Sequence, residues 1–130
     1  MKAKERAIRT CANQLRVSKG LEPLRYSPSL AKAARFQSRN MARRRFFDHT
    51  DPAGRGVARR VARYTDHFGK RVGENIGAGR RTSSATCRSW FKSSGHRANI
   101  LDPDYTSIGT GFATGGAYRR YYTQVFGTGR

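Results

Sequence analysis

The stretch Val72-Gly73-Glu74-Asn75-Ile76-Gly77-Ala78-Gly79 sets one carboxylate and one carboxamide among glycines. It is too rich in glycine for a helix and lacks the Gly-Lys-Ser/Thr ending of a phosphate-binding loop, so we expect a glycine-rich loop. His49 precedes it and His96 follows it, each in a segment of turn-forming residues. Two imidazoles and a carboxylate are the minimum set for a transition-metal site or an acid–base pair, provided that the fold brings them together.

The net charge of the chain is its most unusual property. Its 130 residues hold 27 lysines and arginines against 8 acidic residues, which gives a formal charge of +19 and an isoelectric point near 11.4. Such a surface attracts polyanions, among them nucleic acid, anionic lipid headgroups and acidic or phosphate-rich envelope polymers. The alternative is a compositional bias toward arginine, since the arginines are scattered and Arg43-Arg44-Arg45 is their only run. No motif for sequence-specific nucleic-acid binding accompanies the charge.

The length fits one compact domain over residues 1–130, and we expect a monomer. No segment approaches the ~20 apolar residues of a membrane span. No apolar segment follows the basic N-terminus, so the protein is either cytosolic or its sequence begins after a signal peptide. Cys11 and Cys87, the only cysteines, fit neither a redox motif nor a zinc knuckle. They form either a disulfide, worth about 3–4 kcal/mol, or two small buried side chains.

Apolar spacing and capping residues predict helices followed by a terminal hairpin. Helices are expected at Lys4–Ser18, from Ser27 to the Arg43–Arg45 cluster, at Val57–Tyr64 and at Ala85–Phe91, and strands at Ile108–Ala113 and Tyr121–Phe126. We expect His49, His67 and His96 in loops or turns, with Phe46 and Phe47 anchoring the first of these to the core. This order indicates an α+β fold in which helices cover one antiparallel sheet.

A series of short motifs runs along the chain: Asn13-Gln14-Leu15-Arg16, Gly20-Leu21-x-Pro23-Leu24, Phe47-x-His49-Thr50-Asp51-Pro52, Gly73-Glu74-Asn75-Ile76, Trp90-x-x-Ser93-x-Gly95-His96-Arg97-x-Asn99-Ile100-Leu101, Ile108-Gly109-x-Gly111 and Tyr122-Thr123-Gln124. Together they resemble the bacterial branch of the CAP superfamily, which comprises cysteine-rich secretory proteins, antigen 5 and plant pathogenesis-related 1 proteins (SCP-like extracellular domains). The motifs cover nearly the whole chain and follow the order of the family.

The resemblance implies an α-β-α sandwich, usually secreted, with a central open cleft. In animal and plant members two histidines and two glutamates line this cleft, and some members bind zinc or another divalent cation there. His49 and Glu74 match the first histidine and the first glutamate. Ser93 and Tyr121 stand where the second glutamate and the second histidine belong. As in other bacterial-type members, His96 is expected to occupy the vacated part of the cleft.

These positions define the candidate site. We expect the ligand-binding cleft to be lined by His49, Glu74, Asn75, Ser93, His96 and Tyr121. Of these, His49, Glu74 and His96 are the candidate metal ligands, for zinc or another divalent cation with an open water position, and the candidate catalytic residues. The alternative is that Glu74 holds an imidazole or backbone amides and stiffens its loop. The chain has no Gly-x-Ser-x-Gly elbow and no demonstrable nucleophile.

The resulting expectation is a secreted CAP-domain module. Its cleft would bind a ligand or a divalent ion, and its cationic surface would hold it to an anionic envelope polymer, a lipid surface or an acidic partner. A metal-assisted hydrolase and a nonspecific polyanion binder are the two alternatives. Because secreted proteins fold under oxidising conditions, the family context also favours a disulfide between Cys11, in the first helix, and Cys87, in the helix that carries Trp90.

Overall fold

The computed structural model describes residues 2–68 and 71–128. The helices are α1 (Lys2–Ser18), α2 (Pro28–Arg44), α3 (Val57–Ala62), α4 (Ser83–Lys92) and α5 (Ser94–Ile100), and the strands are β1 (Arg25–Tyr26), β2 (Val72–Ala78), β3 (Tyr105–Gly115) and β4 (Arg119–Thr128). The strands form one sheet in the order β1-β3-β4-β2. The long strands are antiparallel, whereas β1 runs parallel to β3. Within the described residues, no helix is both long and apolar enough to cross a membrane.

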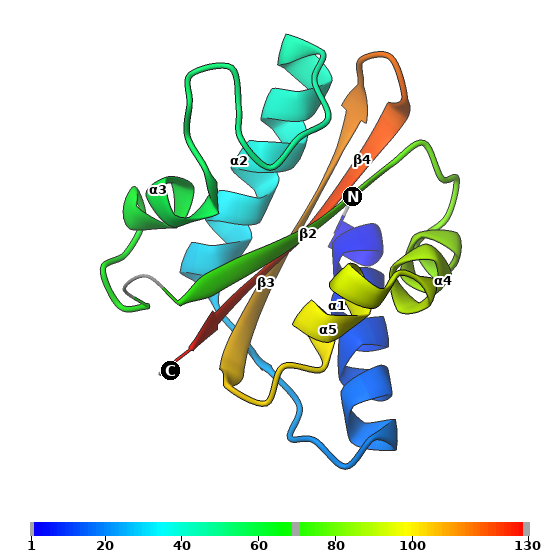
Figure 1. Cartoon of the computed structure of the whole chain (residues 1–130). Coiled ribbons are helices and arrows are strands. Elements are labelled where there is room, and N and C mark those ends of the chain that lie inside the picture. The colour runs from blue at the N-terminus through cyan, green and yellow to red at the C-terminus, as the bar shows by residue number, and fades with distance from the viewer. Residues whose placement is uncertain (1, 69–70, 129–130) are drawn as a thin grey trace.

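Helices cover both faces of this sheet. Figure 1 shows α2 and α3 on one side and α1, α4 and α5 on the other. The predicted α+β fold, an α-β-α sandwich, is confirmed. The sheet differs from the expectation in two strands. One is β2, described below, and the other is β1, since a strand of two residues carries no periodic pattern that a sequence could reveal.

Two glycines let α2 lie directly on the sheet. A Cβ atom added at Gly109 would lie 2.0 Å from the backbone nitrogen of Ala31, and one added at Gly111 would lie 2.4 Å from that of Arg35. The helix has small side chains where it meets these glycines, namely Ala31 and Ala34, and both are fully buried. The helix begins as predicted, since the Ser27 side chain accepts a hydrogen bond from the Leu30 N–H and Pro28 occupies the first turn.

On the opposite face, polar side chains fix α1 to the loops around it. Asn13 bonds the backbone of Leu24 in both directions, accepting at 2.7 Å and donating at 3.1 Å. Arg16 is 2% exposed and donates to the carbonyl oxygens of Ile100 and Asp102 at 2.8 and 2.9 Å. The first of the short motifs therefore joins the N-terminal helix to the segment between α5 and β3.

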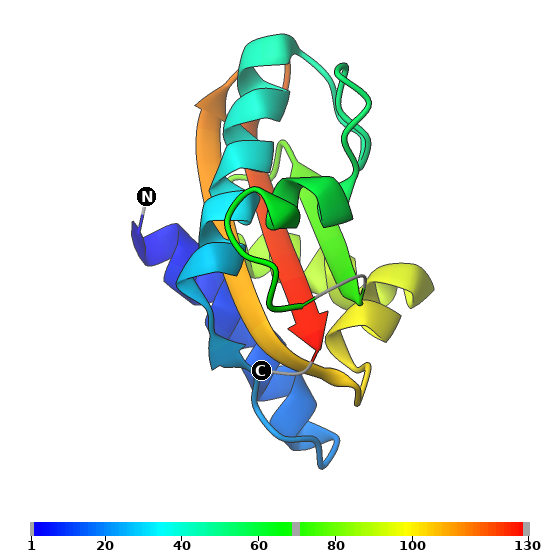
Figure 2. The ribbon, with the colours of Figure 1, turned by 90° about the vertical axis from the view of Figure 1, so that its left-hand side faces the viewer.

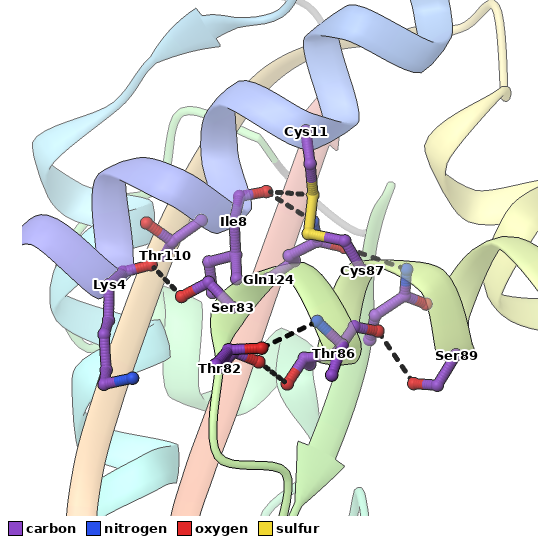
Figure 3. Close-up of a disulfide and its surroundings, with 12 residues drawn as sticks. Lys4, Ile8, Cys11, Thr82, Ser83, Thr86, Cys87, Ser89, Thr110 and Gln124 are labelled. Carbon is purple, nitrogen blue, oxygen red and sulfur yellow. Dashed lines mark hydrogen bonds between the residues drawn. A yellow bond between two sulfur atoms is a disulfide. The ribbon is translucent and has the colours of Figure 1, made fainter.

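A disulfide joins α1 to α4 (Figure 3). Cys11 and Cys87 are bonded, with their Cα atoms 6.4 Å apart, which confirms the predicted pairing. Close to it, the hydroxyl of Ser83 donates to the carbonyl of Lys4 at 3.1 Å. Trp90 lies in the same hydrophobic cluster and is 1% exposed. The bridge thus holds together two of the three helices that cover this side of the sheet.

Two segments that we expected to be loop or turn are regular structure. The glycine-rich stretch is strand β2, which pairs with β4 along its whole length. The segment of His96 is helix α5, which starts directly after α4, and the extended backbone of Ser93 separates the two helices. Ser94 and Gly95, residues typical of a helix end, instead begin α5. Phe46 packs against a core cluster as expected, but Phe47 is 46% exposed.

Candidate functional site

The candidate site is built on β2, which lies at one edge of the sheet and runs across the front of Figure 1. Side chains alternate between the two faces of a strand. A Cβ atom at Gly73 would meet Tyr105 and Asn99, and one at Gly77 would meet Thr86 and Trp90, so these positions face α4 and α5. Glu74 points to the other face, toward α3. The glycines therefore serve to let α4 and α5 approach the strand.

Glu74 is held by a buried arginine of α3. Arg60 is fully buried, and its Nη1 donates to Oε2 of Glu74 at 2.5 Å while its Nη2 lies 3.3 Å from Oε1. The same Nη2 donates to the backbone carbonyl of His49. Glu74 itself is 5% exposed. A carboxylate so deep in the protein needs a paired charge, and Arg60 supplies it.

His49 completes the bonding of the carboxylate from the solvent side. Its Nδ1 lies 2.9 Å from Oε1 of Glu74, and its side chain is 54% exposed. This hydrogen bond raises the pKa of His49, against the opposing effect of partial burial. Since Nδ1 is engaged, Nε2 is the nitrogen that remains for an external group.

His96 reaches the same region from α5, with opposite electrostatics. Burial, followed by the charge of His49, lowers the pKa of His96. Its Nδ1 is buried and has no partner among the residues that the structure describes. The site therefore combines one imidazole whose pKa is raised with one whose pKa is lowered. We call His49, Arg60, Glu74 and His96 the polar cluster.

The other three predicted cleft residues do not join the polar cluster. Asn75 is fully buried and donates to the His96 carbonyl at 3.1 Å and to Oε1 of Gln124 at 3.0 Å. Tyr121 is 1% exposed and pairs with Ala78, four residues or about 13 Å along β2 from Glu74. Ser93 lies at the junction of α4 and α5 and makes no capping bond with its side chain. Asn75 and Tyr121 are core residues.

The family model of the cysteine-rich secretory proteins, named CAP, matches residues 10–126. This chain belongs to the CAP family. The protein YkwD of Bacillus subtilis (strain 168) is 34% identical over 124 residues, which are 95% of this chain and 47% of YkwD. The CAP domain therefore spans about half the length of that relative.

Solved structures share the fold. An extracellular protein containing an SCP domain from Bacillus anthracis str. Ames superposes with a TM-score of 0.87 at 27% identity, over 98% of this chain and 41% of its own. An outer surface protein of Borrelia burgdorferi superposes with a TM-score of 0.89 at 19% identity, over 99% and 95% of the two chains. The second likeness concerns the fold alone.

The polar cluster of this CAP domain does not fit the ligand set that the sequence suggested. Both carboxylate oxygens of Glu74 are engaged by Arg60, and one also by His49. A cation bound at Glu74 would face the buried guanidinium directly. In the described part of the chain, no three His, Cys, Asp or Glu side chains form a group that could hold a metal ion. These contacts argue against a metal site that uses Glu74, and a metal titration decides the question.

Arg60 is the site residue that sequence reasoning missed. The chain holds 27 basic residues, so one arginine among them attracted no notice. A signal was nevertheless present. Arg60 follows Val57 by three residues and precedes Tyr64 by four, which places it on the apolar face of this helical segment. A buried arginine needs acceptors for its N–H groups, and Glu74 supplies two of those of Arg60.

Proposed function

We propose that this CAP domain is a secreted, monomeric binding module. Its cationic surface attaches it to an anionic envelope polymer, a lipid surface or an acidic partner, and its polar cluster receives a ligand. The observation that carries the attachment is the placement of the acidic residues. Three of the eight acidic residues, Glu5, Asp51 and Glu74, are buried, so few carboxylates lie among the cations at the surface.

Each of these buried carboxylates forms an ion pair with an arginine. Glu5 pairs with Arg35 at 2.9 Å and Asp51 with Arg55 at 2.8 Å, in addition to the pair of Glu74 and Arg60. Two further acids, Asp102 and Asp104, share Arg71. Most of the +19 charge therefore lies on side chains without an acidic neighbour. Such a surface draws polyanions by releasing their counterions.

The attachment is tested with inorganic polyphosphate as the probe and neutral dextran as the control. We expect polyphosphate to bind at roughly physiological salt, with log K falling linearly as log salt concentration rises. Dextran should not bind. Absence of polyphosphate binding at about 0.05 M salt would overturn the attachment, because counterion release is strongest there.

The polar cluster suits a ligand with an anionic group. Below the raised pKa of His49, the charges of His49 and Arg60 exceed that of Glu74 by one, and the exposed imidazole carries the excess. We expect inorganic phosphate to shift the NMR signal of the His49 ring at about pH 5.5 and not at about pH 8.5. In His49→Gln the ring signals of His67 and His96 should not move with phosphate. A shift of the His67 signal as large as that of His49 would mean nonspecific binding and no site.

A second candidate function is hydrolysis, favoured by the opposite pKa directions of the two imidazoles. His49 would donate a proton and neutral His96 would accept one, a division of roles that such pairs support. With p-nitrophenyl acetate as the probe, a bell-shaped pH profile that His49→Gln and His96→Gln each abolish would support an enzyme. A rate equal to that of free imidazole would exclude this chemistry for the ester.

The metal-assisted form of that enzyme is decided by calorimetric titration of metal-stripped protein with Zn²⁺. Because Arg60 and His49 already occupy Glu74, we expect no one-to-one binding that depends on this carboxylate. Glu74→Gln is the control, since it keeps the shape of the side chain. One-to-one binding in the parent protein that Glu74→Gln and His49→Gln both remove would instead establish the metal site.

A further inference from the structure

A hollow lies beside the outer edge of β3 and is lined mainly by residues of α1 and α2. Figure 2 shows how these two helices flank β3. Strand β1 pairs with β3 only at Ser107 and Ile108. Further along β3, Glu5 of α1 accepts from the hydroxyl of Thr110 and from the backbone N–H of Phe112. The hollow has a volume of about 570 Å³. It is lined by Lys2, Glu5, Arg6, Arg9, Tyr26, Arg35, Arg39 and Thr110. Five of these eight side chains are cations.

A second hollow lies along the same helix. Its volume is about 340 Å³, and it shares Arg35 and Arg39 with the first. Its further cations are Lys32 and Arg43. The exposed ridge of α2 therefore separates two basic hollows. We call Lys2, Arg6, Arg9, Lys32, Arg35, Arg39 and Arg43 the α2 cationic face.

The α2 cationic face has almost no acidic side chains. A helix that only faces solvent would normally carry charges of both signs. Helix α2 contains five basic residues and no Asp or Glu. Arg35, Arg39 and Arg43 follow one another at four-residue spacing, where like charges repel and destabilise a helix. Glu5 is the one acidic residue that lines either hollow, and it is 5% exposed. Its carboxylate already accepts hydrogen bonds from Arg35 and from the backbone N–H of Phe112.

The guanidinium groups of the face keep their donors available except that of Arg35, whose Nε and Nη2 donate to Glu5. Within the part of the chain that the structure describes, Arg6, Arg39 and Arg43 make no hydrogen bond to a protein acceptor through their side chains. Arg9 lies over the ring of Tyr26 at 4.6 Å. Stacking uses the flat face of a guanidinium and leaves its in-plane N–H groups free. In-plane donors of this kind grip phosphate in pairs.

We propose that the α2 cationic face is the docking surface for a linear polymer of phosphate groups. The inference rests on the proposed attachment to a polyanion and gives that attachment a location and a chemistry. A chain can follow the two hollows on either side of α2, whereas a flat membrane would meet only the ridge. The two hollows also offer lipid only one exposed large hydrophobic side chain, Tyr26, and the guanidinium of Arg9 lies over its ring.

The test compares two charge reversals of equal size. Arg39→Glu with Arg43→Glu changes the face, and Arg88→Glu with Lys92→Glu changes α4 at the same four-residue spacing. All four side chains are exposed, and the second of each pair lies in the last turn of its helix. Binding of inorganic polyphosphate is measured over a series of salt concentrations. Arg39→Gln with Arg43→Gln, and melting curves of every variant, guard against effects of misfolding.

We expect the α2 reversal to weaken polyphosphate binding at least tenfold and to lower the salt slope by about one to two, since two phosphate contacts are lost. The α4 reversal should cost less than threefold. Equal losses in both variants would overturn the proposed face while leaving the attachment in place. No binding by the parent protein would overturn the attachment itself. Polyglutamate bound as tightly as polyphosphate, or anionic phospholipid vesicles bound in preference to it, would overturn the phosphate polymer as the partner.

Discussion

Among single residues, Glu74 is the centre of the polar cluster, because its carboxylate contacts both Arg60 and His49. It is 5% exposed, and Arg60, which pairs with it, is fully buried. An ion pair withdrawn from water contributes little net stability, but removing one partner leaves the other charged and unpaired. The cluster is therefore a rigid support for the exposed imidazole of His49.

Removal of the guanidinium of Arg60 should accordingly destabilise the protein strongly. We expect Arg60→Met to lower the free energy of unfolding by about 3–5 kcal/mol, because Glu74 would keep a buried charge with no cation beneath it. Urea denaturation measures the loss. The exposed neighbour supplies the control, since Arg59→Met should change stability by no more than about 0.5 kcal/mol. The double variant Arg60→Met with Glu74→Met should recover much of the loss. Equal effects of Arg60→Met and Arg59→Met would show that the pair is dispensable.

The two imidazoles should make opposite contributions to the pH dependence of stability. The pKa of His49 is raised in the folded protein, so the His49–Glu74 bond stabilises fully below the ordinary value of 6.5 and fades as pH rises through the raised value. The pKa of His96 is lowered, so its burial destabilises increasingly as pH falls from 6.5 toward the lowered value.

Urea denaturation at about pH 5.5 and about pH 8.5 tests both signs. The stability advantage of the parent protein over His49→Gln should be larger at the acidic pH. Any advantage over His96→Gln should be smaller there. The expectation for either residue fails if its difference runs the other way or stays constant with pH.

At the scale of elements, glycine positions govern how closely the layers approach. We expect Gly111→Ala to cost about 1–3 kcal/mol or more, because the new methyl group would lie 2.4 Å from the backbone of α2, which cannot yield as a side chain would. Gly95→Ala is the matched control in α5. It meets open space in a helix and should stabilise by about 0.5–1 kcal/mol. Thermal melting compares the two variants, and a neutral Gly111→Ala would mean that α2 can move off the sheet.

The same close approach explains which elements could be predicted from the sequence. Helices α1 and α2 bury one apolar stripe each, so their spacing and the Ser27 cap were sufficient. Strand β2 hides its pattern, because Gly73 and Gly77 occupy the positions that a buried strand normally fills with large side chains. Helix α5 was missed for a similar reason, since Ser94 and Gly95 are typical of a helix end.

The candidate site was predictable only in part. The resemblance identified His49 and Glu74, which are in contact, and His96, whose pKa responds to the charge of His49. It could not identify Arg60, because the motifs contain no arginine at that position and the contact joins residues in separate elements. Nor could it separate Glu74 from Asn75, since neighbouring strand residues face opposite sides and the strand itself had not been foreseen.

At the scale of the whole molecule, one sheet is shared by two helical layers. The core cluster of Trp90 lies between the sheet and α1, and the clusters of Val125 and Met41 lie on the side of α2. Strands β3 and β4 contribute residues to both sides. The two helical layers therefore depend on the same strands. Disruption of the sheet would expose the core on both of its sides.

We accordingly expect the chain to unfold as a single cooperative unit, as the expectation of one domain over residues 1–130 requires. Fluorescence of Trp90, the only tryptophan, reports the layer of α1 and α4, whereas far-ultraviolet circular dichroism reports all the helices. The two transitions in guanidinium should coincide.

Reduction of the Cys11–Cys87 bridge, which spans 76 residues, should lower the free energy of unfolding by about 4 kcal/mol and move both transitions together. A fluorescence transition that precedes the circular dichroism transition, before or after reduction, would show that the layer of α1 and α4 comes away while α2 stays folded on the sheet.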